Sequence, residues 1–409
     1  MQPVSEEELV TLAEIQDARK RLEGVAVPTP LDRSRALSDR IGGLAFVKCE
    51  NLQRTGSFKI RGAYNRISRL TPEERAAGVV AASAGNHAQG VALAASLSDT
   101  RPTVFMPQAA PLPKVEATKR YGAEIVLAGK DVGEAFTAAR EWAAKEGAVF
   151  VHPFDHRHVI AGQGTIGLEM VEQADEIGTV VVPVGGGGLI SGIAAALRAS
   201  LDDVRIVGVQ AKGAAAFPPS LAKGEPVTLD SMSTIADGIA ANFPGRLTFR
   251  HVRDQVDEIA TVTDEALAEA LVFSLERMKL VLEPAGAAGV AAVLSGATEL
   301  KPPVVVLLSG GNIDPVLLLR VIRFGLSSAG RYFAFHTRIP DRPGELHRLL
   351  GLIAEEGANI LGIDHHRIGM FMSFEQVDIA LQVETRGRDH IERLVERLTE
   401  AGYQVEAHS

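Results

Sequence analysis

A run of four glycines is the strongest chemical signal in this sequence. Gly185, Gly186, Gly187 and Gly188 stand between an apolar stretch at 180–184 and an Ala-rich stretch at 189–197. Successive glycines let backbone N–H groups converge on one point beside a helix N-terminus, which suits a phosphate group. The loop lacks the Lys-Ser/Thr pair of a P-loop, and Ile190 breaks the G-x-G-x-x-G spacing of dinucleotide sites. We therefore expect a small phosphate-bearing ligand, with a tight strand–helix turn that binds nothing as the alternative.

Ser309 has a similar setting, because it follows an apolar run at 304–308 and precedes two glycines and Asn312. In open α/β sheets, ligands bind at the carboxyl ends of the strands. We expect Ser309 to project into that crevice, and an ordinary helix N-cap is the alternative.

Two further segments carry reactive or polar side chains. Lys59 lies between Phe58 and Ile60. A lysine that is partly desolvated beside a cofactor can have a lowered pKa and act as nucleophile or base, whereas a lysine taken alone is more often a surface residue. The segment 83–87 follows another apolar run, and its backbone N–H groups could hold a carboxylate. For its last residue, His87, the alternative is a helix-start residue whose ring is already hydrogen-bonded.

The elements that must position these residues alternate between β-rich runs and Ala-rich helical stretches from about residue 30 to 325. Many runs are continuously apolar, as in strands buried on both faces of a parallel sheet covered by helices. The pattern predicts an α/β body with strands at 45–49, 78–82, 103–106, 124–127, 180–184, 205–209 and 304–308, and with helices that include 1–25, 133–145 and 265–278.

The C-terminal residues follow a different pattern. Apolar Val377, Ile379, Leu381 and Val383 alternate with residues that are mostly polar, as in a half-exposed strand, and helical spacing follows at 391–398. With strands at 332–338, 359–364 and 403–406 and a helix at 343–356, the order is the βαββαβ of a ferredoxin-like fold. We predict a catalytic domain at 1–328, with a small lobe at roughly 50–150, and a separate domain at 329–409.

Composition excludes several classes of protein. The 409 residues contain 42 Lys and Arg against 51 Asp and Glu, a net charge of −9, which argues against a nucleic-acid or membrane-surface binder. Cys49 is the only cysteine, which rules out an intrachain disulfide framework and a Cys-rich zinc site. His152, His156 and His158 cluster without the carboxylates or cysteines of a metal site, and no apolar run is long enough to span a bilayer. We expect a cytoplasmic protein without a metal site.

The segments SFKIRGA (57–63), SAGNHAQG (83–90), PVGGGGL (183–189) and LLSGGN (307–312), in this order, resemble the fold-type II pyridoxal-phosphate enzymes. Within that family the threonine/serine dehydratases, or threonine ammonia-lyases, are most similar, and TIADGIA (234–240) and ERMKLVLEPAGAAG (276–289) add to the resemblance. It covers roughly residues 5–325, and DRPGEL (341–346) resembles part of an ACT domain, a regulatory amino-acid-binding unit. The implied fold is α/β: a tryptophan-synthase-β-like body of two open lobes, followed by a ferredoxin-like ACT domain.

The resemblance implies pyridoxal 5'-phosphate as the cofactor. Lys59 would be the catalytic residue, which holds the cofactor aldehyde and later takes the substrate α-proton. The cofactor would be bound by Phe58 against its ring, Gly185, Gly186, Gly187 and Gly188 on its phosphate, Asn86 at the ring hydroxyl, Ser309 at the ring nitrogen, and Gly238 and Glu283 in the pocket wall. The substrate would be bound by Ser83, Ala84, Gly85, Asn86 and His87 at its carboxylate, with Phe154 and Asp155 at its border.

The implied reaction removes water and then ammonia from L-threonine to give 2-oxobutanoate, and converts L-serine to pyruvate. A serine at the ring nitrogen stabilises a protonated pyridinium less than a carboxylate does, which favours expulsion of a β-leaving group over transamination. Serine racemases carry a serine at the position of Ala84, so we expect little racemisation. Several relatives have a metal-binding glutamate at the position of Gln210, so we expect weak or no dependence on Mg²⁺.

The ACT-like segment implies control by a branched-chain amino acid in a homodimer or homotetramer. The effector would bind at Asp341, Gly344, Glu345 and Leu346, where Pro343 suits the first position of a helix. A domain used only for assembly is the alternative. For the whole protein the alternatives are a serine racemase, a 3-hydroxyaspartate ammonia-lyase or a β-replacement enzyme, and a non-catalytic amino-acid sensor. Lys59 argues against the sensor, which has no need of such an amine.

Overall fold

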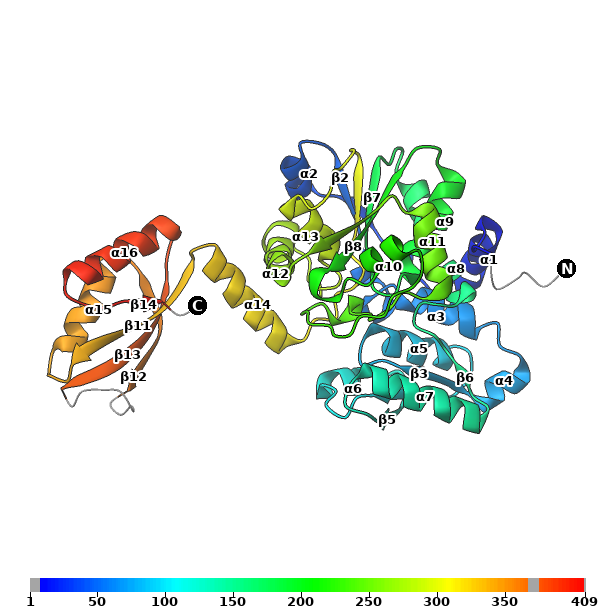
Figure 1. Cartoon of the computed structure of the whole chain (residues 1–409), viewed down its shortest axis with the longest axis horizontal. Coiled ribbons are helices and arrows are strands. Elements are labelled where there is room, and N and C mark those ends of the chain that lie inside the picture. The colour runs from blue at the N-terminus through cyan, green and yellow to red at the C-terminus, as the bar shows by residue number, and fades with distance from the viewer. Residues whose placement is uncertain (1–7, 367–374, 408–409) are drawn as a thin grey trace. The chain divides into compact units, whose positions relative to one another are not determined.

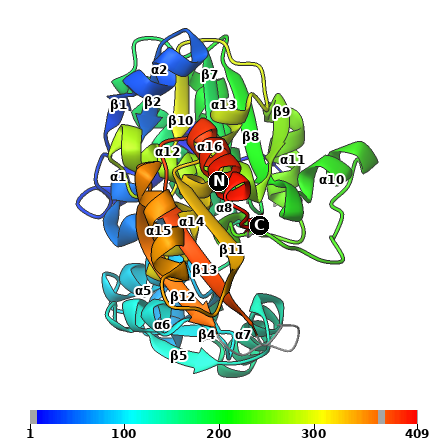
Figure 2. The ribbon, with the colours of Figure 1, turned by 90° about the vertical axis from the view of Figure 1, so that its left-hand side faces the viewer.

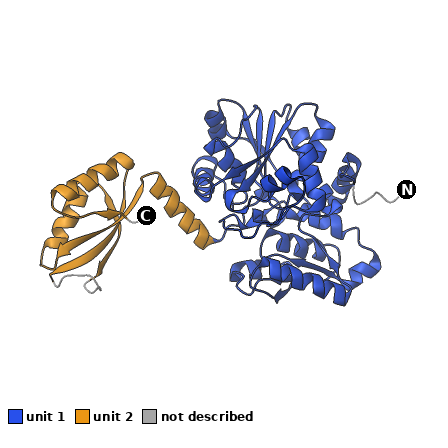
Figure 3. Ribbon diagram, viewed as in Figure 1, with its two compact units in different colours: residues 1–314 blue, residues 315–409 orange. Residues whose placement is uncertain are grey.

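The computed structural model describes residues 8–366 and 375–407. The chain divides into two compact units, residues 1–314 and 315–409 (Figure 3). The boundary precedes the one expected at 328 by the 14 residues of helix α14 (Pro315–Ser328), which groups with the second unit. None of the helices in the described residues is long and apolar enough to cross a bilayer.

The larger sheet of the first unit is parallel except at one edge, where β1 pairs antiparallel with β2. Its order is β1 (Leu31–Arg33), β2 (Ala45–Lys48), β10 (Val304–Leu307), β7 (Thr179–Pro183), β8 (Arg205–Ala211) and β9 (Glu258–Val262). The smaller sheet is parallel throughout, in the order β5 (Glu124–Leu127), β4 (Pro102–Met106), β3 (Val79–Ala82) and β6 (Val149–Phe150). The α/β prediction is confirmed, and each strand expected in this unit is present within two residues of its predicted ends.

Helices flank both sheets, which lie in two lobes of the first unit (Figure 1). Around the larger sheet are α1 (Leu12–Leu22), α2 (Arg35–Ile41), α8 (Arg157–Gln173), α9 (Gly188–Ser200), α10 (Phe217–Lys223), α11 (Arg246–Gln255), α12 (Asp264–Phe273) and α13 (Ala288–Ser295). With the smaller sheet are α3 (Lys59–Ile67), α4 (Pro72–Ala77), α5 (Asn86–Ser96), α6 (Leu112–Lys119) and α7 (Val132–Glu146).

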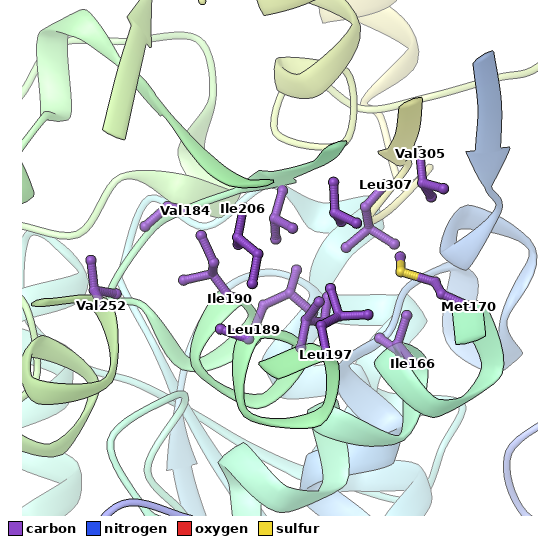
Figure 4. Packing of buried hydrophobic residues seen from close by; sticks show 14 of the residues in the cluster. Ile166, Met170, Val184, Leu189, Ile190, Leu197, Ile206, Val252, Val305 and Leu307 are labelled. Atoms are coloured by element: carbon purple, nitrogen blue, oxygen red, sulfur yellow. The ribbon is translucent and has the colours of Figure 1, made fainter. Parts of the chain in front are cut away.

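The main core lies between the larger sheet and helices α8 and α9. Ile166 and Met170 of α8 and Leu197 of α9 pack with Ile206 of β8 and Leu307 of β10, all buried (Figure 4). Burying these apolar surfaces is the main force that holds the helices against the sheet.

Two helices differ from their predicted bounds. The expected helix at 1–25 is α1, which begins at Leu12, and residues 1–7 lie outside the described part of the chain. Thr11 sets this start, because its hydroxyl accepts the Glu14 N–H while the Glu14 carboxylate accepts the Thr11 N–H, a capping box. The expected helix at 265–278 is α12 followed by a π-helical turn, Ser274–Met278.

The second unit has the predicted βαββαβ order. Its antiparallel sheet runs β12 (Asn359–His366), β13 (Gln376–Glu384), β11 (Tyr332–Pro340) and β14 (Glu406–Ala407). Helices α15 (Glu345–Glu355) and α16 (Arg388–Glu400) cover one face of it (Figures 1 and 2). The apolar residues predicted to alternate in β13, Val377 to Val383, are all buried in this core. Helix α15 starts two residues later than predicted, because Gly344 at φ 96° caps it.

Helix α3, which begins with Lys59, contacts both lobes because it packs on α5 and on α8. Its approach to α8 is close: a Cβ atom at Gly162 would lie 2.6 Å from the Arg61 carbonyl oxygen. Only glycine therefore fits at position 162, and the start of α3 is held firmly in place.

A buried network of charges fixes the same helix. The Arg61 guanidinium donates to Glu50 at 2.8 and 2.9 Å and to Glu169 of α8 at 2.5 and 3.1 Å. Lys48 at the end of β2 also donates to Glu169, at 2.6 Å. Since each charge has hydrogen-bonded partners, the network tolerates its burial, but removing one member leaves the others unpaired.

We predict that Arg61→Met destabilises the protein by about 3–5 kcal/mol, because the Glu50 and Glu169 carboxylates lose their main partner in a buried site. Urea unfolding followed by circular dichroism measures the loss. Lys223→Ala, which breaks an exposed ion pair with Glu225, is the control and should leave the transition unchanged. Equal effects of the two substitutions would contradict the role given to Arg61.

Candidate active site

Lys59 lies at the carboxyl edge of β10 because the segment before α3 is tied to the residues after that strand. Ser57 forms a bridge with Gly310, and the Phe58 N–H donates to the Ser309 carbonyl oxygen at 3.3 Å. Ser57 and Phe58 are buried, and Lys59 is half-buried. Ser309 and Lys59 therefore lie together at the end of β10, where the sequence predicts that a ligand binds.

The Lys59 ammonium has few charged neighbours. Its Nζ donates to the Pro153 carbonyl oxygen at 3.3 Å and lies 5.0 Å from the centroid of the Phe58 ring. Burial lowers the pKa of Lys59 to about 8, and the carboxylate of Glu283 opposes that shift. The amine therefore loses its proton at a much lower pH than an ordinary lysine does, which suits a nucleophile or base.

Asn86, the first residue of α5, links the two lobes. Its Nδ2 donates to Glu283 Oε1 at 2.5 Å, and its Oδ1 accepts from Asn312 Nδ2 at 2.8 Å. Burial raises the pKa of Glu283 to about 7, with help from the charge of Asp237, while the Asn86 hydrogen bond opposes the rise. In the sequence Asn312 is only the last residue of the LLSGGN segment, and the fold shows that its side chain orients Asn86.

The glycine loop follows β7 directly, and its backbone N–H groups are available to bind an anion. Its carbonyl groups are turned toward the protein: Gly185 O accepts from Gln210 Nε2 at 3.4 Å, and Gly186 O from Thr248 Oγ1 at 2.6 Å. Across residues 8–366 and 375–407, no acceptor pairs with the N–H groups of Gly186, Gly187 and Gly188. Gly187 has φ 96° and starts α9. Unpaired amides at a helix N-terminus fit a phosphate group.

The loop at 83–87 has the same character. The first hydrogen bond of α5 runs from Gln89 N to Gly85 O, which leaves the amides at the helix start available for a carboxylate. The Ser83 hydroxyl accepts the Gly85 N–H at 3.1 Å. The His87 ring is buried, its Nε2 lies 2.9 Å from the Val151 carbonyl oxygen, and burial lowers its pKa to about 3. Only the backbone of His87 is therefore free to meet a substrate.

Phe154 and Asp155 differ in what they contact. The Phe154 ring covers the glycine loop: a Cβ atom at Gly186 would lie 2.4 Å from three of its carbon atoms. The Asp155 carboxylate instead accepts three N–H groups at the start of α11, from Arg246, Leu247 and Thr248, at 2.9–3.2 Å. Asp155 thus caps α11, and its place at the border of the substrate stays a prediction.

Two other positions named in the sequence analysis lie beside the same residues. A Cβ atom at Gly238 would be 3.8 Å from Glu283 Oε1, which places Gly238 next to that carboxylate. The buried amide of Gln210 accepts the Phe217 N–H at 2.9 Å besides donating to Gly185. In the part of the chain that the structure describes, no three His, Cys, Asp or Glu side chains group as metal ligands would.

The second unit has a hollow of about 260 Å³ beside the loop that joins β11 to α15. It is lined by Ile339, Pro340, Asp341, Arg342, Pro343, Gly344, Leu346, His365 and Val377. Three of the four residues expected to bind an effector are among them, and Glu345 is not.

We predict that in ligand-free protein the rate of acetylation of Lys59 by acetic anhydride rises with pH through a midpoint of about 8. Above that pH the amine is neutral and reacts, and below it the amine is protonated. Glu283→Gln should lower the midpoint further, because it removes the opposite charge that favours the ammonium form. Peptide mass mapping measures the rate, and a midpoint near the ordinary 10.5 of a lysine would contradict the geometry.

The sequence of this chain is similar to those of known proteins. A family model described as pyridoxal-phosphate dependent enzyme matches residues 22–310. An L-threonine ammonia-lyase of Thermotoga maritima is 47% identical over 397 residues, which cover 97% of this chain and 99% of that protein.

Solved structures are similar as well. The processed form of threonine deaminase isoform 2 from Solanum lycopersicum has a TM-score of 0.73 and 36% identity, over 79% of this chain and 93% of that one. Maize serine racemase has a TM-score of 0.73 and 38% identity, over 78% and 99%. A lysine of lowered pKa and a glycine loop with free amides are what such a cofactor needs. The chain belongs to the family of pyridoxal-phosphate-dependent enzymes.

Proposed function

We propose that this protein is a threonine ammonia-lyase, which converts L-threonine to 2-oxobutanoate and ammonia and also converts L-serine to pyruvate. The observation that carries the proposal is the half-buried Lys59, whose pKa is about 8, at the end of β10, where Ser309 follows the strand and Asn86 lies beside Gly310. The similarity to the L-threonine ammonia-lyase, which covers 97% of this chain, supports the choice of substrate.

Lys59 has two tasks in this reaction. Its Nζ would hold the cofactor at the aldehyde group and would act as the base that accepts the substrate α-proton. Bound pyridoxal phosphate supplies an electron sink for that carbon. The Phe58 ring and the Pro153 carbonyl hold the amine without a fixed counter-charge, so that it can cycle between protonated and neutral forms.

The neighbouring groups select β-elimination. The amides of the glycine loop would hold the phosphate, and Asn86, which Glu283 and Asn312 orient, would bind the ring hydroxyl. Ser309 would face the ring nitrogen, and because its hydroxyl is neutral it would stabilise a protonated ring less than a carboxylate does, which favours loss of the β-hydroxyl over transamination. The amides at the start of α5 would hold the substrate carboxylate, and the Phe154 ring lies against the glycine loop.

Purified protein supplied with L-threonine and pyridoxal phosphate should release 2-oxobutanoate. We expect Lys59→Ala to reduce kcat about 10³-fold or more, because one substitution removes both the attachment point and the base. Lys119→Ala, at an exposed lysine paired with Glu116, is the matched control and should keep full activity. Full activity of the Lys59 variant would overturn the assignment of the catalytic residue.

The similarity to maize serine racemase makes racemisation the second candidate function. The half-buried methyl group of Ala84 lies in the loop expected to hold the substrate and cannot carry a proton. We therefore expect chiral chromatography to show D-serine formed from L-serine at least about 100-fold more slowly than pyruvate, in line with the loss of one acid–base group. Comparable rates of the two products would count against the lyase.

The second unit supports a further part of the proposal, which is allosteric control. The hollow beside Asp341, Gly344 and Leu346 is of a size for one amino-acid side chain, and its apolar wall of Ile339 and Val377 favours a branched-chain effector such as isoleucine or valine. We further propose a cytoplasmic homodimer or homotetramer, by resemblance to the family, with weak or no dependence on Mg²⁺, because Gln210 brings no charge.

Titration with isoleucine or valine should change the rate of threonine deamination. Leu346→Arg should raise the half-effect concentration at least about tenfold, because the longer, charged side chain fills the hollow. His347→Arg, at the next and exposed position of α15, is the control and should respond as the natural protein does. Flat titrations with all amino acids would favour a domain used only for assembly.

A further inference from the structure

We propose that His152 is a positioning residue of this active site, whose Nδ1 atom fixes the turn at 152–155 that contacts both Lys59 and the glycine loop. The inference rests on the proposed function, since it takes Lys59 and the loop as the groups that hold the cofactor.

The turn is held by two hydrogen bonds to one atom. His152 Nδ1 accepts the Asp155 N–H at 2.8 Å and the Phe154 N–H at 3.3 Å. A nitrogen that accepts two N–H groups carries a lone pair, so the imidazole is neutral and has its proton on Nε2. Burial, aided by the charges of Arg140 and Lys59 and opposed by Asp155, lowers the pKa of His152 to about 4, in agreement with this neutral form.

The imidazole is itself fixed by aromatic neighbours. Its ring meets Phe136 of α7 edge to face at 5.6 Å and 80°, and Phe150 of β6 at 6.2 Å and 75°. Phe154 packs on it at 4.7 Å and 89°. Edge-to-face contacts of this kind favour one orientation of each ring. Nδ1 is therefore a fixed acceptor at the point where the chain leaves the small sheet.

Each residue after His152 contacts a different part of the site. The Pro153 carbonyl oxygen accepts the Lys59 Nζ–H at 3.3 Å. The Phe154 ring lies over the glycine loop, and Asp155 caps α11, whose Thr248 donates to Gly186 O. If the turn loosens, the amine loses its acceptor and the loop loses the Phe154 ring that covers it.

Two substitutions separate the acceptor from the ring. His152→Asn keeps an acceptor close to the position of Nδ1 but removes the aromatic ring, and His152→Phe keeps the ring but removes the acceptor. The readouts are the Kd of apoenzyme for pyridoxal phosphate, from absorbance titration, and kcat and KM for L-threonine. Circular dichroism checks folding, and His152→Leu, which also lacks an acceptor, replaces the Phe variant if that variant does not fold.

We expect His152→Phe to raise the Kd for pyridoxal phosphate and to lower kcat, each about tenfold, the effect of losing a buried hydrogen bond, with little change in KM. His152→Asn should stay within about threefold of the natural protein. Three results would overturn the inference: both variants behave as the natural protein, both are equally impaired, or only the Asn variant is impaired, which would mean that ring packing alone matters.

The outcome for the natural protein separates this inference from the proposed function. If the natural protein neither binds pyridoxal phosphate nor deaminates threonine, both are overturned. If it does both and His152→Phe does so equally well, the proposed function stands and the role of His152 is overturned.

Discussion

The desolvated amine of Lys59 is the feature on which the rest of this site depends. Desolvation brings the pKa of Lys59 to about 8, and the nearest carboxylate that opposes this, Glu283, has a pKa raised to about 7 by its own burial. A stronger anion beside the amine would keep it protonated, and full exposure would leave it at its ordinary pKa. Phe58 and the Pro153 carbonyl avoid both situations, because they shield the amine from water and carry no charge.

Such an amine can act as nucleophile or base only if its position is fixed, and several contacts hold the elements that carry it. Arg61, two residues further along α3, joins the buried ion network with Glu50 and Glu169. The close contact at Gly162 holds the same helix against α8. On the other side, the Asn86–Glu283 hydrogen bond connects the small lobe to the large one. The candidate site therefore lies where elements of both lobes meet, and the amides proposed to bind ligands are those that a helix start leaves without an intrahelical partner.

The sequence shows the parts of this site that lie within one segment. A reactive lysine, a glycine loop and a serine after an apolar strand are visible as local patterns, and parallel-sheet geometry brings them to one edge. The sequence does not show contacts between distant segments. Asn312 pairs with Asn86, 226 residues away, and Asp155 caps a helix that starts 91 residues later. His152 belongs in the sequence to a cluster of three histidines without the carboxylates or cysteines of a metal site, and only the fold shows which N–H groups its ring accepts. In the second unit, strand alternation and helix periodicity predict the βαββαβ order, but composition alone does not assign α14.

Chemical identification of the cofactor-linked lysine tests the central claim most directly. The holoenzyme would be reduced with sodium borohydride, digested and mapped by mass spectrometry for peptides that carry a pyridoxyl group. The account predicts one modified lysine, Lys59. Burial lowers the pKa of Lys48 as well, but the Lys48 amine is held by an ion pair with Glu169 and by hydrogen bonds to Gln173 and the Thr29 carbonyl oxygen. A pyridoxyl group on any other lysine, with Lys59 unmodified, would contradict the account.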